Sequence, residues 1–511
     1  MKKYIKLIFG RLFIGVLAIL VQFLWMFLLL WKFSIQFTFV NYTIHVLAGV
    51  IVLRIVSRRM NPSYKLAWTF VILMFPVLGL FIYYVFGRSE LTKRTRNRMQ
   101  KVSDEVMTLL PDDGSIQERM RSSSESAANQ SHYISQWAKF PVYENTATQY
   151  YASGEEMFPD MLKALQEAEH FIFLEYFILD EGTMYDQMTE ILIRKAKEGV
   201  DVRLIYDDMG CITTMPAHFY RKLQAHGIKC AAFNPFRPIL SVILNNRDHR
   251  KIFVVDGKIA FTGGINIADE YINAKKRFGY WKDTGIRLEG EAVWSFTCMF
   301  LSMWDYIVRS SEDYSRFMPQ VHQTLEFATD GFVQPYGDTP LDKENTGENV
   351  YMNIISRARR YVYIFTPYLI IDNEMKTILC NAAKSGVDVR IVTPGIPDKK
   401  LVYLLTQADY GILIENGVKI YQYTKGFIHA KCFVCDDEIA TVGSINMDYR
   451  SLYLHFECGV FLYQSKAVLQ VKEDAWNTIA QSEPVTQEFC KNRKWYVRLL
   501  QSVLRLFAPM L

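Results

Sequence analysis

Residues 248–266 read DHRKIFVVDGKIAFTGGIN. The runs IFVVD and KIAFTGG are rich in β-forming residues and flank Gly257, which predicts two strands joined by a tight turn. Side chains two positions apart on a strand share a face, so we expect His249 and Lys251 to lie side by side. An imidazole next to an ammonium group is poorly suited to a core and well suited to binding a phosphate.

The pattern returns at residues 429–446 as HAKCFVCDDEIATVGSIN. The repeated residues keep identical intervals: His249, Lys251, Asp256 and Asn266 in the first copy, and His429, Lys431, Asp436 and Asn446 in the second. A flanking segment, ILIRKAKEGVDVRLI from Ile191, also matches ILCNAAKSGVDVRIV from Ile378. A near-constant offset over this length indicates a duplicated domain. Pseudo-twofold packing would bring both histidines and both lysines into one cleft.

The segments around the repeat alternate between strand and helix patterns. Apolar runs at 171–179 and 200–206 predict buried strands, and the periodicity at 184–197 and 217–225 predicts helices. Strands that alternate with helices imply crossover units and a mixed sheet covered on both faces. The predicted fold is therefore α/β, with two halves of a duplicated domain at 131–315 and 316–485.

The N-terminal region, residues 1–88, is strongly apolar and predicts a membrane anchor. Residues 12–31 and 67–87 are each long enough to span a bilayer. The apolar segment 33–56 carries several polar residues and is either a third span, which we favour, or an interfacial helix. A cleavable signal peptide does not fit the length of the first run. We therefore expect a multi-pass protein of the cell membrane with two or three transmembrane helices.

Charge and composition define the remaining segments. Basic residues are densest just after the anchor, between Arg88 and Arg98, which places the following domain on the cytoplasmic side. Residues 89–130 are charged and Ser-rich and predict a polar linker that is helical only in part. Residues 486–511 predict a basic amphipathic helix, which either caps the second half or lies on the membrane surface.

The overall composition limits the classes of function. The 511 residues have a net charge of +5, which allows a phosphate-bearing partner but is far from typical of a nucleic-acid-binding protein. The eight cysteines have no disulfide-framework spacing and are expected to be reduced. The sequence has no H-E-x-x-H motif or carboxylate cluster, so we expect neither a metal nor a cofactor.

Two His, two Lys and two Asn suit phosphodiester chemistry. Lys251, Lys431 and the amides of Asn266 and Asn446 would bind the phosphate oxygens, with the small residues Gly264 and Ser444 nearby. One histidine would attack phosphorus while the other donates a proton to the departing alkoxide. Each histidine needs an orienting carboxylate, and we assign this role to Asp283 downstream of His249 and to Glu457 downstream of His429.

The other repeated and unrepeated polar residues have simpler interpretations. Asp256 and Asp436 end strands before turns, and a carboxylate that binds backbone amides there is favoured over direct catalysis. His455 and the remaining histidines have no repeated counterpart and are interpreted as surface or packing residues.

The doubled H-x-K-x4-D pattern, followed by Gly or Ser and then Asn, resembles the phospholipase D superfamily. The segments NPSYKLAW (61–68), NNRDHRK (245–251), GSINMDYRS (443–451) and LRLFAPML (504–511) look like bacterial cardiolipin synthases. This resemblance adds Asp256 and Asp436 to the catalytic motif. It implies that two phosphatidylglycerol molecules react to give cardiolipin and glycerol, with His249 as nucleophile and His429 as general acid and then base.

The sequence leaves several alternatives open. The near-symmetry of the two halves does not by itself assign the roles of the two histidines. A phospholipase D-type hydrolase would use the same residues, whereas a nuclease is disfavoured by the anchor and a non-enzymatic scaffold by the two intact motifs. The expected partners are phospholipids and a membrane, with no nucleic acid, and a homo-oligomer is possible.

Overall fold

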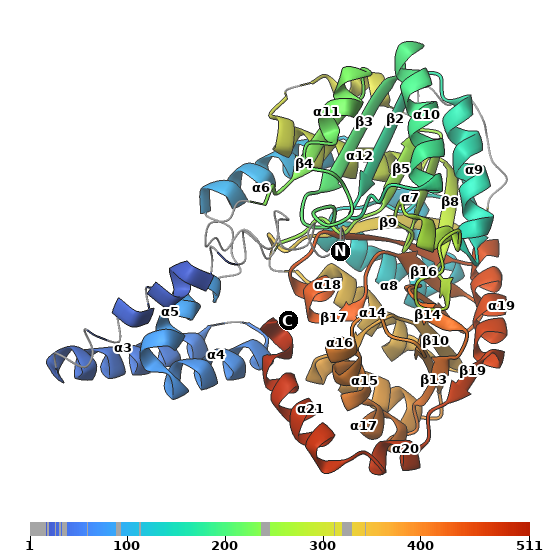
Figure 1. The fold of residues 1–511 in the computed structure, drawn as a ribbon. Coiled ribbons are helices and arrows are strands. Elements are labelled where there is room, and N and C mark those ends of the chain that lie inside the picture. Colours follow the sequence, from blue (N-terminus) through green and yellow to red (C-terminus); the bar gives the residue numbers. More distant parts are fainter. Residues whose placement is uncertain are drawn as a thin grey trace.

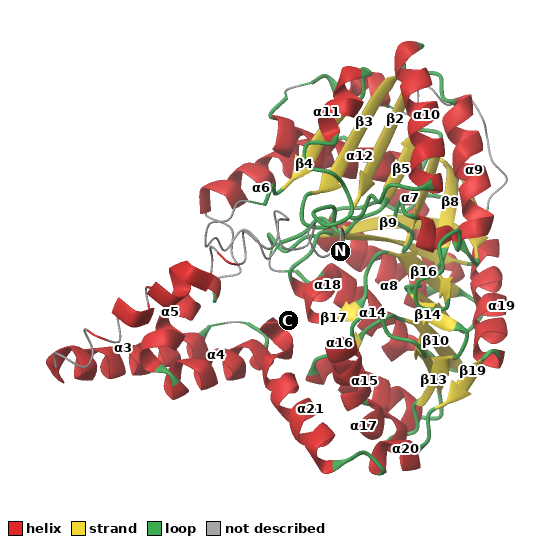
Figure 2. Ribbon diagram, viewed as in Figure 1, coloured by secondary structure: helices red, strands yellow, loops and turns green. Residues whose placement is uncertain are grey.

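The computed structural model describes most of the chain and shows two sheets flanked by helices (Figures 1 and 2). The described residues are 17, 20–25, 27–29, 32, 38–58, 60–87, 93–111, 114–236, 246–310, 312–318, 330–342 and 344–510. Most of the first expected span, residues 12–31, lies outside them.

The first half contains a seven-stranded sheet with the strand order β1-β8-β6-β5-β2-β3-β4. Strands β2, β3 and β4 are parallel, and the remaining pairs are antiparallel. The bounds are β1 Thr146–Tyr151, β2 Phe171–Tyr176, β3 Asp201–Asp207, β4 Lys229–Phe233, β5 Ile252–Val255, β6 Ile259–Gly263 and β8 Gly285–Gly290. The predicted hairpin and the two predicted buried strands are thus present.

The second half repeats this topology in an eight-stranded sheet with the order β19-β13-β12-β10-β15-β16-β18-β9. The bounds are β9 Phe332–Asp338, β10 Tyr361–Phe365, β12 Asp388–Pro394, β13 Lys419–Tyr423, β15 Cys432–Cys435, β16 Ile439–Gly443, β18 Glu457–Tyr463 and β19 Ser482–Pro484. Apart from the added β19, the order matches the first sheet strand for strand. The duplicated mixed α/β fold is therefore confirmed.

Helices cover both sheets, and Ser153, Asp372 and Ser465 each provide a side-chain cap for one of them. The main helices of the first half are α9 (Gly154–Glu167), α10 (Thr183–Lys197), α11 (Tyr220–Ala225) and α12 (Val293–Val308). Those of the second half are α14 (Thr346–Arg357), α15 (Asn373–Lys384), α16 (Lys400–Ala408), α17 (Tyr410–Glu415) and α19 (Lys466–Ala480). The helix expected at 217–225 begins three residues late, because His218 has a φ of +63° and cannot be helical.

Among the described residues, α3 (Thr38–Ser57) is the one helix long and apolar enough to cross a membrane. The expected span at 67–87 is wrong. These residues belong to α4 (Pro62–Met74) and α5 (Pro76–Phe86), and the proline breaks the helix at Phe75. Each piece is about 20 Å long or less, shorter than the hydrocarbon core of a bilayer. Figure 1 shows α3, α4 and α5 projecting from the body.

The expected polar linker is mostly helical and packs on the body. It contains α6 (Lys93–Met107), α7 (Gly114–Ser123) and α8 (Glu125–Tyr133). Met99, Val106 and Met120 are buried in the main hydrophobic core. Single apolar residues at helical spacing in a charged context form a narrow stripe that composition alone does not reveal.

The C-terminal segment forms α20 (Gln487–Lys491) and α21 (Trp495–Phe507), as the amphipathic pattern predicts. Gln501 Nε2 donates a hydrogen bond to Leu404 O at 2.9 Å, so α21 caps α16 of the second half. Trp495 and Leu499 on the same helix are 75% and 58% exposed. The helix therefore caps the second half and still presents an uncovered apolar face.

Candidate active site

His249 reaches the junction of the two halves through a short parallel pairing. Its backbone N–H donates to Phe456 O at 2.9 Å, and Phe456 N–H donates to Arg247 O at 2.8 Å. Phe456 directly precedes Glu457, the first residue of β18. The segment before β5 of the first half is therefore held against the start of β18, which is the counterpart of β8 in the second half.

His429 is positioned in the same way with the halves exchanged. The short strand β14 (Gly426–Ile428) pairs in parallel with β7 (Tyr280–Lys282). The backbone N–H of His429 then donates to Lys282 O at 2.7 Å, one residue before Asp283. Both motif histidines thus lie beside a carboxyl group of the opposite half.

The side-chain contacts follow this crossing. His249 Nδ1 lies 2.9 and 3.0 Å from the two carboxyl oxygens of Glu457. His429 Nδ1 lies 2.7 Å from Asp283 Oδ2. The expected pairing of each histidine with the downstream acid of its own half is wrong, because sequence order does not reveal that the strand starts are exchanged. In both pairs the contact with the acid uses Nδ1, and Nε2 is the nitrogen that does not contact the acid.

The small residues of the motif contact these carboxyl groups. Ser444 Oγ donates to Glu457 Oε2 at 2.5 Å, and Ser451 Oγ donates to Glu457 Oε1. A Cβ at Gly264 would lie 2.1 Å from Asp283 Oδ1. The structure therefore places Gly264 and Ser444 against the acids, and their expected role at the phosphate stays a prediction.

The two asparagines differ in their partners. Asn266 accepts a hydrogen bond from Ile178 N–H at 3.0 Å and donates to the Tyr271 hydroxyl at 2.7 Å. Asn446 Oδ1 is buried and has no hydrogen-bond partner. Asn266 thus contributes at least in part to the local structure, whereas the Asn446 amide is the better candidate for a ligand contact.

The two lysines lie beside their histidines, as the strand periodicity predicts. Lys251 Nζ donates to His249 O at 2.5 Å, and Lys431 Nζ lies 2.9 and 3.0 Å from the ring nitrogens of His429. Burial lowers the pKa of Lys251 to about 8 and that of Lys431 to about 7. Both ammonium groups are buried, so an anionic ligand at this place would restore their charge.

The titration of the two pairs is asymmetric. Burial and the charge of Lys251 hold the pKa of His249 well below its usual value. Burial and Lys431 lower the pKa of His429 to about 4, although Asp283 opposes this shift. The charges of Lys431 and His429 act on His249, and that of Lys251 acts on His429, so both pairs share one electrostatic site.

The carboxyl groups also differ. Burial raises the pKa of Glu457 well above its usual range, while Lys251 and the two serine donors act in the opposite direction. Burial acts to raise the pKa of Asp283 as well. The charges of His429 and Lys431 outweigh this effect, so the pKa of Asp283 is lowered overall. Glu457 is therefore the more basic partner, and Asp283 is the one that best stabilises an imidazolium.

Asp256 and Asp436 lie at the far end of the motif strands and bind backbone. Asp256 accepts hydrogen bonds from the N–H groups of residues 169–171 at 2.7–2.8 Å. Asp436 does the same with residues 359–361 at 2.7–2.9 Å. Both aspartates have positive φ, 52° and 54°, and form the hairpin turn. These contacts support the favoured turn interpretation, and the inclusion of both aspartates among the catalytic residues stays a prediction.

Several residues beside the site escaped the sequence interpretation. The His455 ring lies 5.7 Å from the His249 ring, and the Trp281 ring lies 5.6 Å from the His429 ring. Each precedes an acid by two residues, so the two are equivalent positions in the repeat. Likewise Tyr271 and Ser451 each follow a motif asparagine by five residues. Alignment of the two halves on their acids and asparagines could have found both pairs.

Within the described part of the chain, one group of His, Cys and acidic side chains lies close enough together to bind a metal ion. It comprises His249, His455 and Glu457, whose ligand atoms lie within 4.8 Å of one another. The positive charges of Lys251 and Lys431 act on the same place and disfavour a cation there. The donor set therefore favours an anion such as a phosphate.

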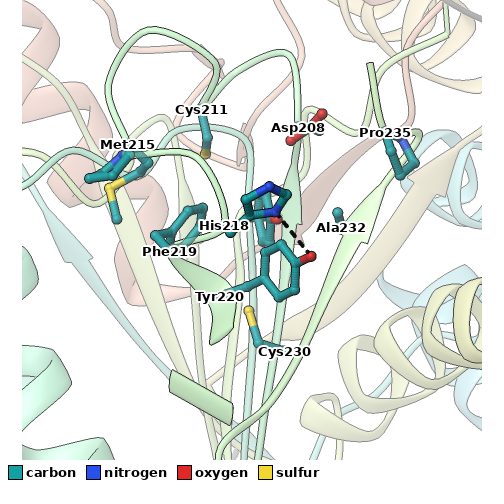
Figure 3. Close-up of a pocket in the computed structure, with 11 residues that line it drawn as sticks. Asp208, Cys211, Met215, His218, Phe219, Tyr220, Cys230, Ala232 and Pro235 are labelled. Atoms are coloured by element: carbon teal, nitrogen blue, oxygen red, sulfur yellow. Dashed lines mark hydrogen bonds between the residues drawn. The ribbon is translucent and has the colours of Figure 1, made fainter. Parts of the chain in front are cut away.

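A cavity of about 250 Å³ opens at the carboxyl ends of β3 and β4. Figure 3 shows Phe219, Met215 and Asp208 around it, with His218 facing Tyr220 at an Nδ1···OH distance of 3.4 Å. The described residues that line it include no member of the two histidine–acid pairs. This cavity is separate from the site described above.

Comparison with known families agrees with this geometry. A family model described as "Cardiolipin synthase, PLD-like domain" matches residues 161–280 and 351–479. A second model, described as "Phospholipase_D-nuclease N-terminal", matches residues 46–88. Each match of the first model covers the central strands of one sheet. The match of the second model, together with α3, indicates membrane association.

Similar proteins cover nearly the whole chain. An uncharacterised protein of Streptococcus mutans serotype c is 45% identical over 465 residues, which span 90% of this chain and 99% of that protein. A cardiolipin synthase of Geobacillus sp. (strain WCH70) is 35% identical over 461 residues, which span 88% and 89%. The crystal structure of phosphatidylserine synthase from Haemophilus influenzae Rd KW20 shares the fold, with a TM-score of 0.56 at 14% identity over 75% of this chain and 97% of that one. The chain therefore belongs to the cardiolipin synthase family of phospholipase D-like proteins.

Proposed function

We propose that this protein is a membrane-associated phosphatidyltransferase that converts two phosphatidylglycerol molecules into cardiolipin and glycerol. The observation that supports this most directly is the crossed pair of dyads, His249 with Glu457 and His429 with Asp283. They share one electrostatic site with two buried lysines. Two histidines whose Nδ1 atoms are held by acids around an anion site suit a double displacement at phosphorus.

In the first step, His249 Nε2 attacks phosphorus of the donor lipid. A P–N bond forms and the P–O bond to the headgroup glycerol breaks. The leaving glycerol oxygen takes the proton of the His429 imidazolium, which the Asp283 carboxylate stabilises. The products are free glycerol and a phosphatidyl group bound covalently to His249.

In the second step, a headgroup hydroxyl of another phosphatidylglycerol attacks phosphorus. Neutral His429 removes the hydroxyl proton, a new P–O bond forms, and the P–N bond to His249 breaks. Cardiolipin leaves, and His429 again holds the proton that the next cycle needs. Protons, bonds and charges therefore balance over the two steps.

The unequal acids support this division of roles between the histidines. Glu457, the more basic acid, holds the Nδ1 proton of His249 more strongly and makes its Nε2 a better nucleophile. Asp283, which is ionised, stabilises the protonated form of His429. The negative phosphodiester raises the pKa of both histidines on binding, so His429 takes up from solvent the proton that it then donates to the leaving glycerol.

The lysines replace the positive charge that a metal ion would otherwise provide. Lys251 and Lys431 lie beside the two histidines and would bind the equatorial oxygens as charge develops on them. The Nδ2 group of Asn446 is a further donor candidate, because it is the side of the amide whose N–H can bind a phosphate oxygen. A bound phosphate would therefore satisfy groups that are otherwise buried without compensation.

The membrane favours a lipid acceptor over water. The apolar faces of α3 and α21 expose Phe39, Leu53 and Trp495 among other large side chains. We propose that these faces contact the bilayer and that the catalytic halves lie on its cytoplasmic side, next to the basic cluster between Arg88 and Arg98. A lipid hydroxyl then competes with water at high local concentration.

The test is mass spectrometry of lipids after incubation of the purified protein with phosphatidylglycerol in micelles. We expect cardiolipin and glycerol in equal amounts, loss of both in His429→Ala, and no change in His226→Ala, which alters an exposed histidine. Phosphatidic acid with glycerol would instead identify a hydrolase. That result would refute the proposed transfer while preserving the proposed catalytic pairs.

A further inference from the structure

The membrane anchor contacts the segment that follows the second motif. Asn61 caps α4, because its Oδ1 accepts a hydrogen bond from Ser63 N–H at 3.0 Å. The same side chain donates to Tyr453 OH at 2.9 Å and to Asp372 Oδ2 at 2.8 Å. Asn61 is therefore fixed to the catalytic body through the two hydrogens of its amide group.

The next residues of the anchor add further contacts. The Tyr449 hydroxyl donates to Ser63 Oγ at 3.0 Å. The ring of Tyr64 meets the rings of Tyr449 and Tyr453 edge-on, with centroid distances of 5.9 and 6.1 Å. We call residues 61–64 the anchor turn. Leu504 and Ala508 pack into the same cluster, so the C-terminal end also helps to hold it.

Tyr449 and Tyr453 belong to α18 (Tyr449–Tyr453), which has two functional sides. These tyrosines are four residues apart and share the face toward the anchor turn. Ser451 lies about 200° around the helix from Tyr449 and points the other way. Its hydroxyl donates to Glu457 Oε1, the acid that contacts His249.

A second contact leads from α18 to the same place. Arg450 Nε donates to His455 Nε2 at 3.4 Å, and the His455 ring lies beside that of His249. Ser451 Oγ also accepts a hydrogen bond from Asn446 N–H at 3.1 Å, which fixes the motif asparagine. A shift of α18 would therefore move three groups of the site together.

We propose that the anchor turn has a positioning role in catalysis: it holds α18 in place and thereby positions Ser451 and Glu457 for His249. Asn61 and Tyr64 are positioning residues in this role, which is additional to attachment to the membrane. The inference rests on the proposed function in one respect: its test uses the release of glycerol from phosphatidylglycerol as the measure of turnover. It holds for a lipid acceptor and for water alike.

The structure supplies discriminating variants. The Tyr64 hydroxyl is buried without a hydrogen-bond partner, so Tyr64→Phe keeps every contact that matters and Tyr64→Ala removes the ring. Asn61→Ser keeps a capping side chain for α4 and removes the two donors to the body. Leu66→Ala is the matched control, because Leu66 lies on the same helix and is 63% exposed.

The experiment measures glycerol release from phosphatidylglycerol micelles, where attachment to a bilayer is not limiting. We expect kcat to fall about 3- to 30-fold in Tyr64→Ala and Asn61→Ser with KM nearly unchanged, and Tyr64→Phe and Leu66→Ala to match the unmodified protein. In a Ser451→Ala background, Tyr64→Ala should have a smaller effect than in the unmodified protein, because both changes disturb the contact of Ser451 with Glu457. Thermal unfolding of each variant identifies any that fail to fold.

Two results would overturn the inference. One is an unchanged kcat in Tyr64→Ala and Asn61→Ser. The other is a full additional loss when Tyr64→Ala is combined with Ser451→Ala, which would indicate a general structural effect. Absence of glycerol release from the unmodified protein would instead refute the proposed function, so the two failures are distinguishable.

Discussion

Substitution of Gly264 by alanine tests whether Asp283 must be held against His429. The new Cβ would lie 2.1 Å from Asp283 Oδ1, so the carboxylate must move by roughly 1 Å to reach an ordinary contact distance. The 2.7 Å hydrogen bond to His429 Nδ1 does not survive a shift of that size. A displacement of about 1 Å at a catalytic group lowers activity about 10²-fold, and overpacking a buried site lowers stability by about 1–3 kcal/mol.

The assay is glycerol release from phosphatidylglycerol micelles, measured well below the unfolding temperature of each variant. Gly114→Ala is the control, because a Cβ there meets no atom within 4 Å. Ser444→Ala is the counterpart in the other half and removes one donor from Glu457 without any overlap, so its effect should be smaller. An unaltered kcat in a folded Gly264→Ala protein would refute the reasoning, because it would mean that the His429–Asp283 contact is dispensable.

Three further predictions follow from the same geometry. Asp283→Asn should lower kcat about 10⁴-fold, because the amide no longer fixes the protonated Nδ1 tautomer of His429. Steady-state kinetics measures this loss, and a decrease in kcat of less than tenfold would contradict the prediction. Asp256→Ala should leave three backbone N–H groups without their acceptor and lower stability by about 1–3 kcal/mol, while the folded enzyme keeps its kcat. Thermal unfolding and kinetics separate the two effects, and a large loss of kcat at full folding would place Asp256 in the catalytic set. The pH profile of kcat/KM should be bell-shaped. Its acid limb lies well below the usual range of a histidine, because the lowered pKa keeps the His249 lone pair available there. Its alkaline limb runs through pH 7 to 8, where Lys431 and Lys251 lose their charge. Lys431→Arg should move the alkaline limb to higher pH, and an unmoved limb would show that Lys431 does not cause it.

Much of the fold was predictable because the sequence contains it twice. The spacing from His249 to Asn266 and its exact repeat predicted the hairpins and the duplicated sheets. The expected span at 67–87 was not predicted correctly, because hydropathy averages over Pro76 and the break at Phe75. The buried helices of residues 93–133 were missed for the opposite reason: Met99 and Met120 are isolated apolar residues in a charged segment.

The candidate site was predictable in its residues and not in its contacts. The acids Asp283 and Glu457 were identified, but their exchange between halves depends on two parallel pairings, β14 with β7 and residue 248 with residue 456. Pairings between distant segments leave no local pattern in a sequence. The closeness of Gly264 and Ser444 to these acids was missed for the same reason, since only the three-dimensional structure shows it.

The most direct test of the central claim is a burst experiment with a phosphatidyl donor that carries p-nitrophenol as its leaving group. This leaving group needs no general acid, so the first step proceeds without His429, whereas the second step still needs His429 as base. The account predicts that His429→Ala releases about one equivalent of p-nitrophenol per enzyme and then stops, with the phosphatidyl group on His249, and that His249→Ala shows no burst. A burst in His249→Ala and none in His429→Ala would reverse the roles. Absence of a burst in both variants would contradict a covalent intermediate.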